Sequence, residues 1–335
     1  MQHIDLVPIW TVILAVGVFM YVFLDGFDLG VGILFPFARD DSARTLMMNS
    51  VAPVWDGNET WLILGGAGLL AAFPLAFAII IPALYFPILL MLLGLIFRGV
   101  AFEFRHRAGP AQHWWDKAFF WGSLIATFAQ GMVLGNYIEG FEVSGRHFAG
   151  TSFDFLRPFA LMTGIGLVFG YGLLGATWLV LKTEGDLQGW ARGRARFFLI
   201  GVLAFIAVVS IWTPFLKPYI ADRWFSWPNI AFLAPVPVVT GLIVLALWHG
   251  LRRDRDVLPF VCALGLFAMC YLGLGVSVWP YVVPHTITLW DAAASEKSQA
   301  FLLIGTLFLL PIVLMYTGWS YFVFRGKVRA EMGYH

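Results

Sequence analysis

Residues 62–97 read LILGGAGLLAAFPLAFAIIIPALYFPILLMLLGLIF, a run of 36 residues without a charged side chain. A helix crosses the roughly 30 Å core of a bilayer with about 20 mostly apolar residues. The run is therefore long enough for two membrane-spanning helices, and Pro74 marks the expected turn between them. Because lipid offers no partner to backbone polar groups, helices are the expected structure.

The whole chain has the same character, since 60% of its 335 residues are hydrophobic and 12% are charged. Soluble domains carry about 25% charged residues, so a soluble globular enzyme and a disordered chain are both excluded. A net charge of +1 argues against a nucleic-acid partner. Two cysteines are too few for a disulfide framework. We therefore expect an all-α polytopic membrane protein, with residues 1–335 as a single integral membrane domain.

Nine apolar stretches of suitable length predict nine transmembrane helices. They cover residues 8–30, 51–72, 75–97, 118–138, 158–181, 197–216, 230–249, 258–278 and 299–324. With nine spans, 16 of the 21 Lys and Arg residues fall in loops on the C-terminal side of the membrane. Positive loops stay in the cytoplasm, so the N-terminus is expected outside and the C-terminus inside.

Four carboxylates lie within the predicted spans, where ionisable groups are costly and usually functional. Asp25 and Asp28 share one face of the first helix because they are three residues apart, and Asp56 and Glu59 do the same in the second. With a rise of about 1.5 Å per residue, both pairs fall at a similar depth towards the cytoplasmic side. We therefore expect the four carboxylates to form one cluster that faces the cytoplasm.

The end of the third predicted helix carries Arg98 and Glu103 on the same side of the membrane. Arg98 is the expected counter-charge of the cluster. Several carboxylates close together in a medium of low dielectric cannot all stay ionised, which suits a proton relay or a cation site. If the relay exists, Asp56→Asn is expected to remove activity and to leave assembly normal.

The alternative interpretation of the same acids is structural. In that case they cap helix ends and bond to the neighbouring Trp55, Asn58 or Trp61, and they only hold the fold together. The residue pattern by itself leaves both interpretations open.

Histidines are absent from the middle of every predicted span. A haem inside a helical bundle needs axial ligands, usually His or Met, at a suitable depth. The seven histidines fall in loops or at span ends: His3, His106, His113, His147, His249, His285 and His335. We therefore expect this chain to bind no haem and no metal of its own, and to contain no catalytic residue.

Five segments resemble subunit II of the bd-type quinol oxidases. They are DGFDLGVG at 25–32, NSVAPVWDGNETW at 49–61, FRGVAFEFR at 97–105, PHTIT at 284–288 and WDAA at 290–293. The segments follow the order found in that family, and the resemblance covers essentially the whole chain. Its compact length and the Glu59-Thr60 pair are more similar to the cyanide-insensitive branch.

The resemblance implies a fold of two four-helix bundles, 1–138 and 158–278, with 299–324 as a peripheral ninth helix. It implies a bacterial inner-membrane oxidase in which a partner, subunit I, holds haem b and haem d and receives quinol and oxygen. Membrane lipids surround such a complex. Whether this chain holds a quinone, and whether small accessory subunits bind, stays open.

The resemblance also associates Asp56 with proton delivery from the cytoplasm, and it places Asp25 and Asp28 nearby. Other family members carry Gln where this chain has Glu59, which makes Glu59 a weaker candidate for an obligatory relay group. Two further functions stay open: an ion-coupled secondary transporter, whose helices would also carry buried acids, and a purely structural assembly subunit.

Overall fold

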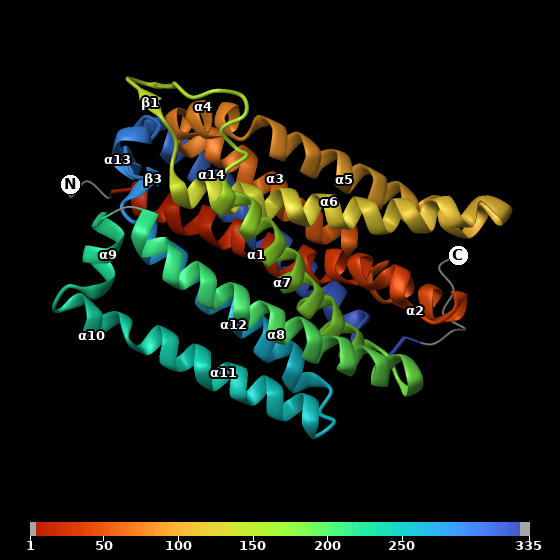
Figure 1. Ribbon diagram of the computed structural model, residues 1–335. Coiled ribbons are helices and arrows are strands. Elements are labelled where there is room, and N and C mark those ends of the chain that lie inside the picture. Colours follow the sequence, from red (N-terminus) through yellow and green to blue (C-terminus); the bar gives the residue numbers. More distant parts are fainter. Residues whose placement is uncertain (1–4, 217, 329–335) are drawn as a thin grey trace.

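A computed structural model describes residues 5–216 and 218–328, and this part of the chain is almost entirely helical (Figure 1). The α-helices are α1 (Val7–Leu34), α2 (Asp41–Val51), α3 (Trp55–Ala72), α4 (Pro74–Ala83), α5 (Tyr85–Phe104), α6 (Gln112–Glu139), α7 (Pro158–Lys182), α8 (Gly185–Leu216), α9 (Pro218–Phe225), α10 (Asn229–Leu233), α11 (Pro235–Arg252), α12 (Val257–Val278), α13 (Leu289–Ala292) and α14 (Glu296–Val323). Short 3-10 turns are η1 (Phe35–Phe37), η2 (Arg105–Arg107) and η3 (Gly109–Ala111). Two small antiparallel hairpins pair β1 (Val143–Ser144) with β2 (His147–Phe148), and β3 (Tyr281–Val283) with β4 (Ile287–Thr288).

Eight helical segments within residues 5–216 and 218–328 are long and apolar enough to cross a membrane. They are Val7–Phe37, Tyr85–Arg107, Gly109–Glu139, Pro158–Lys182, Gly185–Leu216, Asn229–Arg252, Val257–Val278 and Glu296–Val323. Each overlaps one of the nine predicted spans. The predicted span 51–72 corresponds to α3, which has 18 residues and carries two carboxylates. The prediction of a multi-pass all-helical chain is confirmed, and the ninth crossing stays a prediction.

Two predicted helix boundaries were wrong. The span 75–97 is not one helix, because the chain breaks at Leu84 and separates α4 from α5. Pro87 lies in the first turn of α5 and has no backbone N–H to donate to the carbonyl of Ala83, so the helix cannot continue regularly across Leu84. Helix α5 then continues to Phe104, so Arg98 lies inside the helix and not at its end.

The region between the first two predicted spans also contains a helix that the sequence pattern did not reveal. Helix α2 begins after Asp40, whose side chain accepts a hydrogen bond from the Ala43 amide at 2.8 Å. It ends at Val51, and α3 begins only at Trp55.

Helix α1 lies at the centre of the fold and packs against α3, α6 and α7 (Figure 1). Its contact with α7 is made through glycine. A Cβ atom built on Gly30 would lie 2.7 Å from the backbone nitrogen of Gly175, so only glycine allows this approach. Membrane helices associate through such small residues because apolar side chains gain nothing by leaving lipid.

Replacing Gly30 with Ala is expected to destabilise the protein by roughly 1–3 kcal/mol, because the added methyl group pushes α1 and α7 apart. The midpoint of thermal unfolding in detergent measures the effect. Gly189→Ala in α8 is the matched control, since nothing lies within 4 Å of a Cβ atom there. Equal shifts for the two variants would contradict the close-contact argument.

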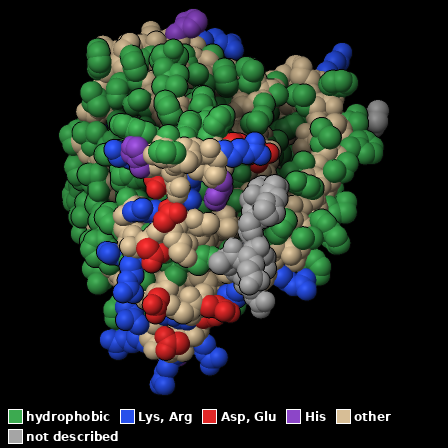
Figure 2. Space-filling model, turned by 90° about the vertical axis from the view of Figure 1, so that its right-hand side faces the viewer, with side chains coloured by type: hydrophobic (Ala, Val, Ile, Leu, Met, Phe, Trp, Pro, Cys, Tyr) green, Lys and Arg blue, Asp and Glu red, His purple; other side chains and the backbone are tan. Residues whose placement is uncertain are grey.

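One end of the helices collects charged side chains. Helix α2, the α5–α6 turn, the α11–α12 turn and the end of α14 all lie at this end, whereas α13 and the β-hairpins lie at the other (Figure 1). Figure 2 faces the charged end and shows Lys, Arg, Asp and Glu side chains there, bordered by hydrophobic ones. This is the end that the distribution of loop charges predicts to face the cytoplasm.

Candidate functional site

The centre of the candidate site is Arg98, whose side chain is fully buried. One terminal nitrogen of its guanidinium donates to Asp25 Oδ1 at 2.6 Å, and the other donates to Glu59 Oε1. The three residues come from α5, α1 and α3 respectively. A guanidinium is always charged and has its donors in a fixed fork, so it can hydrogen-bond two carboxylates at once, while its single positive charge balances one of them.

Asp28 lies in the same buried region but has a different partner. Its Oδ2 atom accepts a hydrogen bond from Asn58 Nδ2 at 2.6 Å, and the Asn58 Oδ1 atom accepts one from the Tyr321 hydroxyl at 2.8 Å. Asn58 thereby connects α1, α3 and α14. The structure thus brings together Asp25, Asp28 and Glu59, as the depth argument predicts. With Arg98 and Asn58 they form one buried group.

Both aspartates keep one oxygen available. Asp28 Oδ1 is buried and has no hydrogen-bond partner within residues 5–216 and 218–328, and Asp25 Oδ2 is buried and has only the neighbouring Tyr21 side chain beside it. Buried polar atoms normally have such a partner. Each carboxylate can therefore accept a proton on its second oxygen and keep its existing bond.

The remaining predicted residues lie outside this buried group. Asp56 and Glu103 are exposed on the surface, and no hydrogen bond joins either side chain to the group in the described part of the chain. The Trp55 ring stacks on Phe102 with 4.9 Å between centroids, which fixes the start of α3 against α5. Trp61, further along α3, is buried in the interior of the protein.

Glu59 connects the surface to the interior. A quarter of its side chain is exposed, whereas Arg98 and Asp25 are buried. Asp56 precedes Glu59 by three residues on α3, and the two carboxylates are close enough to repel each other. The order from surface to interior is therefore Asp56, Glu59, Arg98 and Asp25.

A second buried polar chain, which the sequence pattern did not predict, adjoins Asp25. The Tyr171 hydroxyl donates to Gln130 Oε1 at 2.9 Å, and Gln130 Nε2 donates to the Tyr21 hydroxyl at 2.7 Å. Tyr21 lies one helical turn before Asp25 on α1, and the two side chains interact. A glutamine inside an apolar span was the available signal, because such side chains hydrogen-bond across helices.

The histidines of the described residues do not form a haem site. All five lie in turns, in strand β2 or near helix ends, and none is buried: His106, His113, His147, His249 and His285. This arrangement does not fit a haem held between facing helices within residues 5–216 and 218–328.

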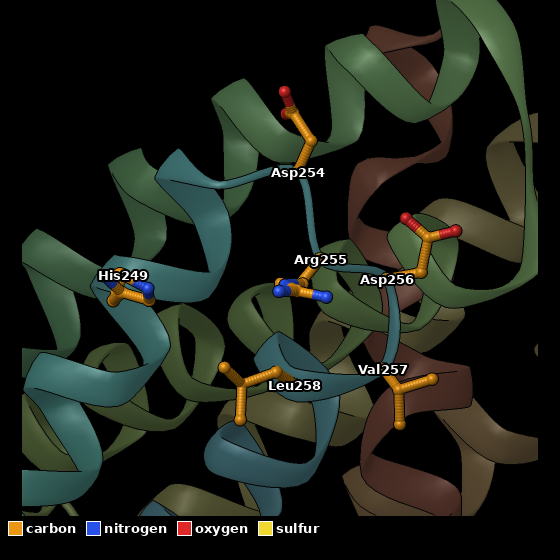
Figure 3. Close-up of a pocket in the computed structure, with 6 residues that line it drawn as sticks. All are labelled: His249, Asp254, Arg255, Asp256, Val257 and Leu258. Carbon is orange, nitrogen blue, oxygen red and sulfur yellow. The ribbon is translucent and has the colours of Figure 1, made fainter.

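A cavity of about 710 Å³ lies at the α11–α12 turn, away from the buried group (Figure 3). Its walls come from the end of α11, the turn itself and the start of α12, as the labelled side chains from His249 to Leu258 show. None of the predicted site residues lines this cavity.

Comparisons with known proteins agree with the motifs quoted above. Residues 6–324 match the family described as cytochrome bd terminal oxidase subunit II. The chain is 31% identical to cytochrome bd ubiquinol oxidase subunit 2 of Bacillus subtilis (strain 168), over 96% of both proteins. It is 29% identical to cytochrome bd-I ubiquinol oxidase subunit 2 of Escherichia coli (strain K12), over 96% of this chain and 95% of that one.

The fold has a solved counterpart as well. A chain in the structure of bd oxidase from Geobacillus thermodenitrificans superposes with a TM-score of 0.77 at 18% sequence identity, covering 96% of this chain and 99% of that chain. At this identity the match supports the arrangement of helices only. From the family match and the identity to the Bacillus protein, we conclude that this chain belongs to the family of cytochrome bd terminal oxidase subunit II.

Proposed function

We propose that this chain, as subunit II of a bd-type quinol oxidase, carries protons from the cytoplasm towards the site where subunit I reduces oxygen to water. The observation that supports the proposal is the line of carboxylates on Arg98, from partly exposed Glu59 to fully buried Asp25. Intramembrane ionisable residues in such a line are typical of proton relays.

In this proposal each group has a distinct task. Asp56, at the surface, collects protons from cytoplasmic water, and Glu59 takes them into the protein. Asp25 receives the proton that Glu59 releases, since both carboxylates bond to the guanidinium of Arg98. Arg98 keeps its own protons throughout and stabilises whichever carboxylate is charged.

The same proposal places quinol oxidation at the outer side and proton uptake at the inner side, so that turnover builds a membrane potential without a dedicated pump.

The proposal also assigns haem b, haem d and the quinol site to subunit I. It places the N-terminus outside, 1–138 and 158–278 in two helical bundles, and 299–324 at the periphery. Helix α14 supports the last point, because the central part of this apolar helix is not buried within the chain.

Of the other two functions, the ion-coupled transporter has less support. A transported cation needs carboxylates that are free to coordinate it, whereas Asp25 and Glu59 are already bonded to Arg98. A purely structural subunit accounts for the ion pairs but not for the line from surface to interior. Turnover measurements on variants separate it from the relay.

Asp56→Asn tests the outer part of the path. Asp56 is exposed, so water can partly replace it, and we expect turnover to fall by about tenfold with normal haem content, a loss smaller than that for a buried relay group. Quinol oxidase activity of the purified complex, divided by its haem absorbance, measures the effect. Asp40→Asn, an exposed acid at the start of α2, is the control. Turnover equal to that of the wild type would show that Asp56 is not part of the path.

A further inference from the structure

A second cavity, of about 390 Å³, lies between α1, α7, α12 and the end of α14. Its wall is aromatic. Phe27 stacks on Trp178 with 4.1 Å between ring centroids, and Phe260 packs 5.2 Å from Trp178. Tyr321 of α14 completes the wall, 6.4 Å from Phe27. The cavity is therefore suited to an apolar chain and not to a polar solute.

Two cations border this apolar cavity, Lys182 at the end of α7 and Arg325 just after α14. Lys182 Nζ lies 5.1 Å from the centroid of Trp178 and donates to the backbone carbonyls of Phe324 and Gly326. Arg325 is exposed and lies over the ring of Phe322 at 4.0 Å. Neither cation forms a salt bridge with a carboxylate of the described residues.

Two acids of neighbouring segments are already engaged. Asp256 binds Lys327 at 2.8 Å and Arg192 at 2.6 Å, and Asp28 is bonded to Asn58 behind the wall. The residues that line the cavity include Lys182 and Arg325 and no carboxylate, so its lining carries a net positive charge. The indole N–H of Trp178 is buried and has no acceptor within residues 5–216 and 218–328, so an oxygen-rich ligand would satisfy it.

We propose that this cavity binds one anionic phospholipid, with an acyl chain on the aromatic wall and the phosphate between Lys182 and Arg325. Basic pockets between membrane helices on the cytoplasmic side recognise anionic headgroups in this way. A neutral quinone would gain nothing from two cations, and free phosphate would leave the apolar wall uncovered. The lipid would also attach α14 to the bundle, since this helix is otherwise fixed mainly near its ends by Gln299 and Tyr321.

The test measures lipid retention by the intact purified oxidase complex. The complex is equilibrated in nanodiscs of phosphatidylglycerol and phosphatidylcholine, and the bound lipid is identified by native mass spectrometry. The wild type is expected to retain one phosphatidylglycerol. Arg325→Gln is expected to weaken retention about fivefold and Lys182→Gln with Arg325→Gln about 30-fold, equivalent to roughly 1 kcal/mol per cation.

Two further variants separate headgroup, chain and folding effects. Leu264→Trp fills the cavity and keeps both cations, so it should also displace the lipid. Arg253→Gln, an exposed cation at the α11–α12 turn, should leave retention unchanged. Equal phosphatidylglycerol retention in Arg325→Gln, Leu264→Trp and the wild type would overturn the proposal. So would a bound quinone in place of the lipid, or full displacement of the lipid by inorganic phosphate.

Discussion

Arg98→Met is expected to prevent the oxidase complex from accumulating in the membrane. The substitution leaves Asp25 and Glu59 without their shared counter-charge, and Asp25 is completely buried. Removing one member of a buried ion pair costs about 3–5 kcal/mol, a large share of the roughly 5–15 kcal/mol that stabilises a typical protein. Haem absorbance of solubilised membranes and immunodetection of this chain measure the loss.

A charge-balanced variant separates this electrostatic cause from a simple packing defect. Adding Asp25→Asn and Glu59→Gln to Arg98→Met removes all three charges at similar volume, so assembly should recover while turnover does not. Arg98→Lys keeps the charge but loses the fork that holds two carboxylates, and it should give an intermediate yield. Normal yield of Arg98→Met alone would show that the ion pairs contribute little to the fold.

The depth argument from sequence located most of the buried group for a simple physical reason. Acids in apolar spans must meet a partner, and the rise per residue of a helix fixes where on neighbouring helices that partner can be. Asp25 and Asp28 do meet residues of α3 and α5 in the structure.

The same argument could not place Asp56, because it depended on where the second helix begins. The apolar pattern starts at residue 51, but α2 ends there and α3 begins at Trp55. Asp56 is therefore the second residue of its helix, at the surface, and not a full turn inside it. Asn58 and Trp61 turn towards the interior in its place.

The sequence analysis also did not predict the buried hydrogen bonds between uncharged polar residues. Tyr21, Gln130 and Tyr171 come from three helices, and their hydrogen bonds depend on how α1, α6 and α7 pack. Sequence periodicity predicts which face of a helix is apolar, but it does not predict which helices meet. Close contacts through glycines such as Gly30 determine that packing.

Asp25→Asn is expected to lower quinol oxidase turnover by about 100-fold or more, with normal assembly and normal reduction of the haems by quinol. Asparagine has a similar volume and can still accept a hydrogen bond from Arg98, but its amide cannot carry a proton. Arg98 keeps Glu59 as its charged partner, so the fold should remain intact.

Single-turnover kinetics of the Asp25→Asn complex distinguish a relay from a structural role. Electron transfer from quinol should keep its rate, and only the steps that take up protons should slow. Asp28→Asn tests the branch from Asp28 to Asn58. The amide of Asn58 cannot take up or release a proton, so this substitution should lower turnover less than Asp25→Asn. Asp186→Asn, an exposed acid at the start of α8, is the control that should leave turnover unchanged. If Asp25→Asn turns over at the wild-type rate across the physiological pH range, the buried line of carboxylates serves stability alone. Protons must then reach the oxygen site through subunit I.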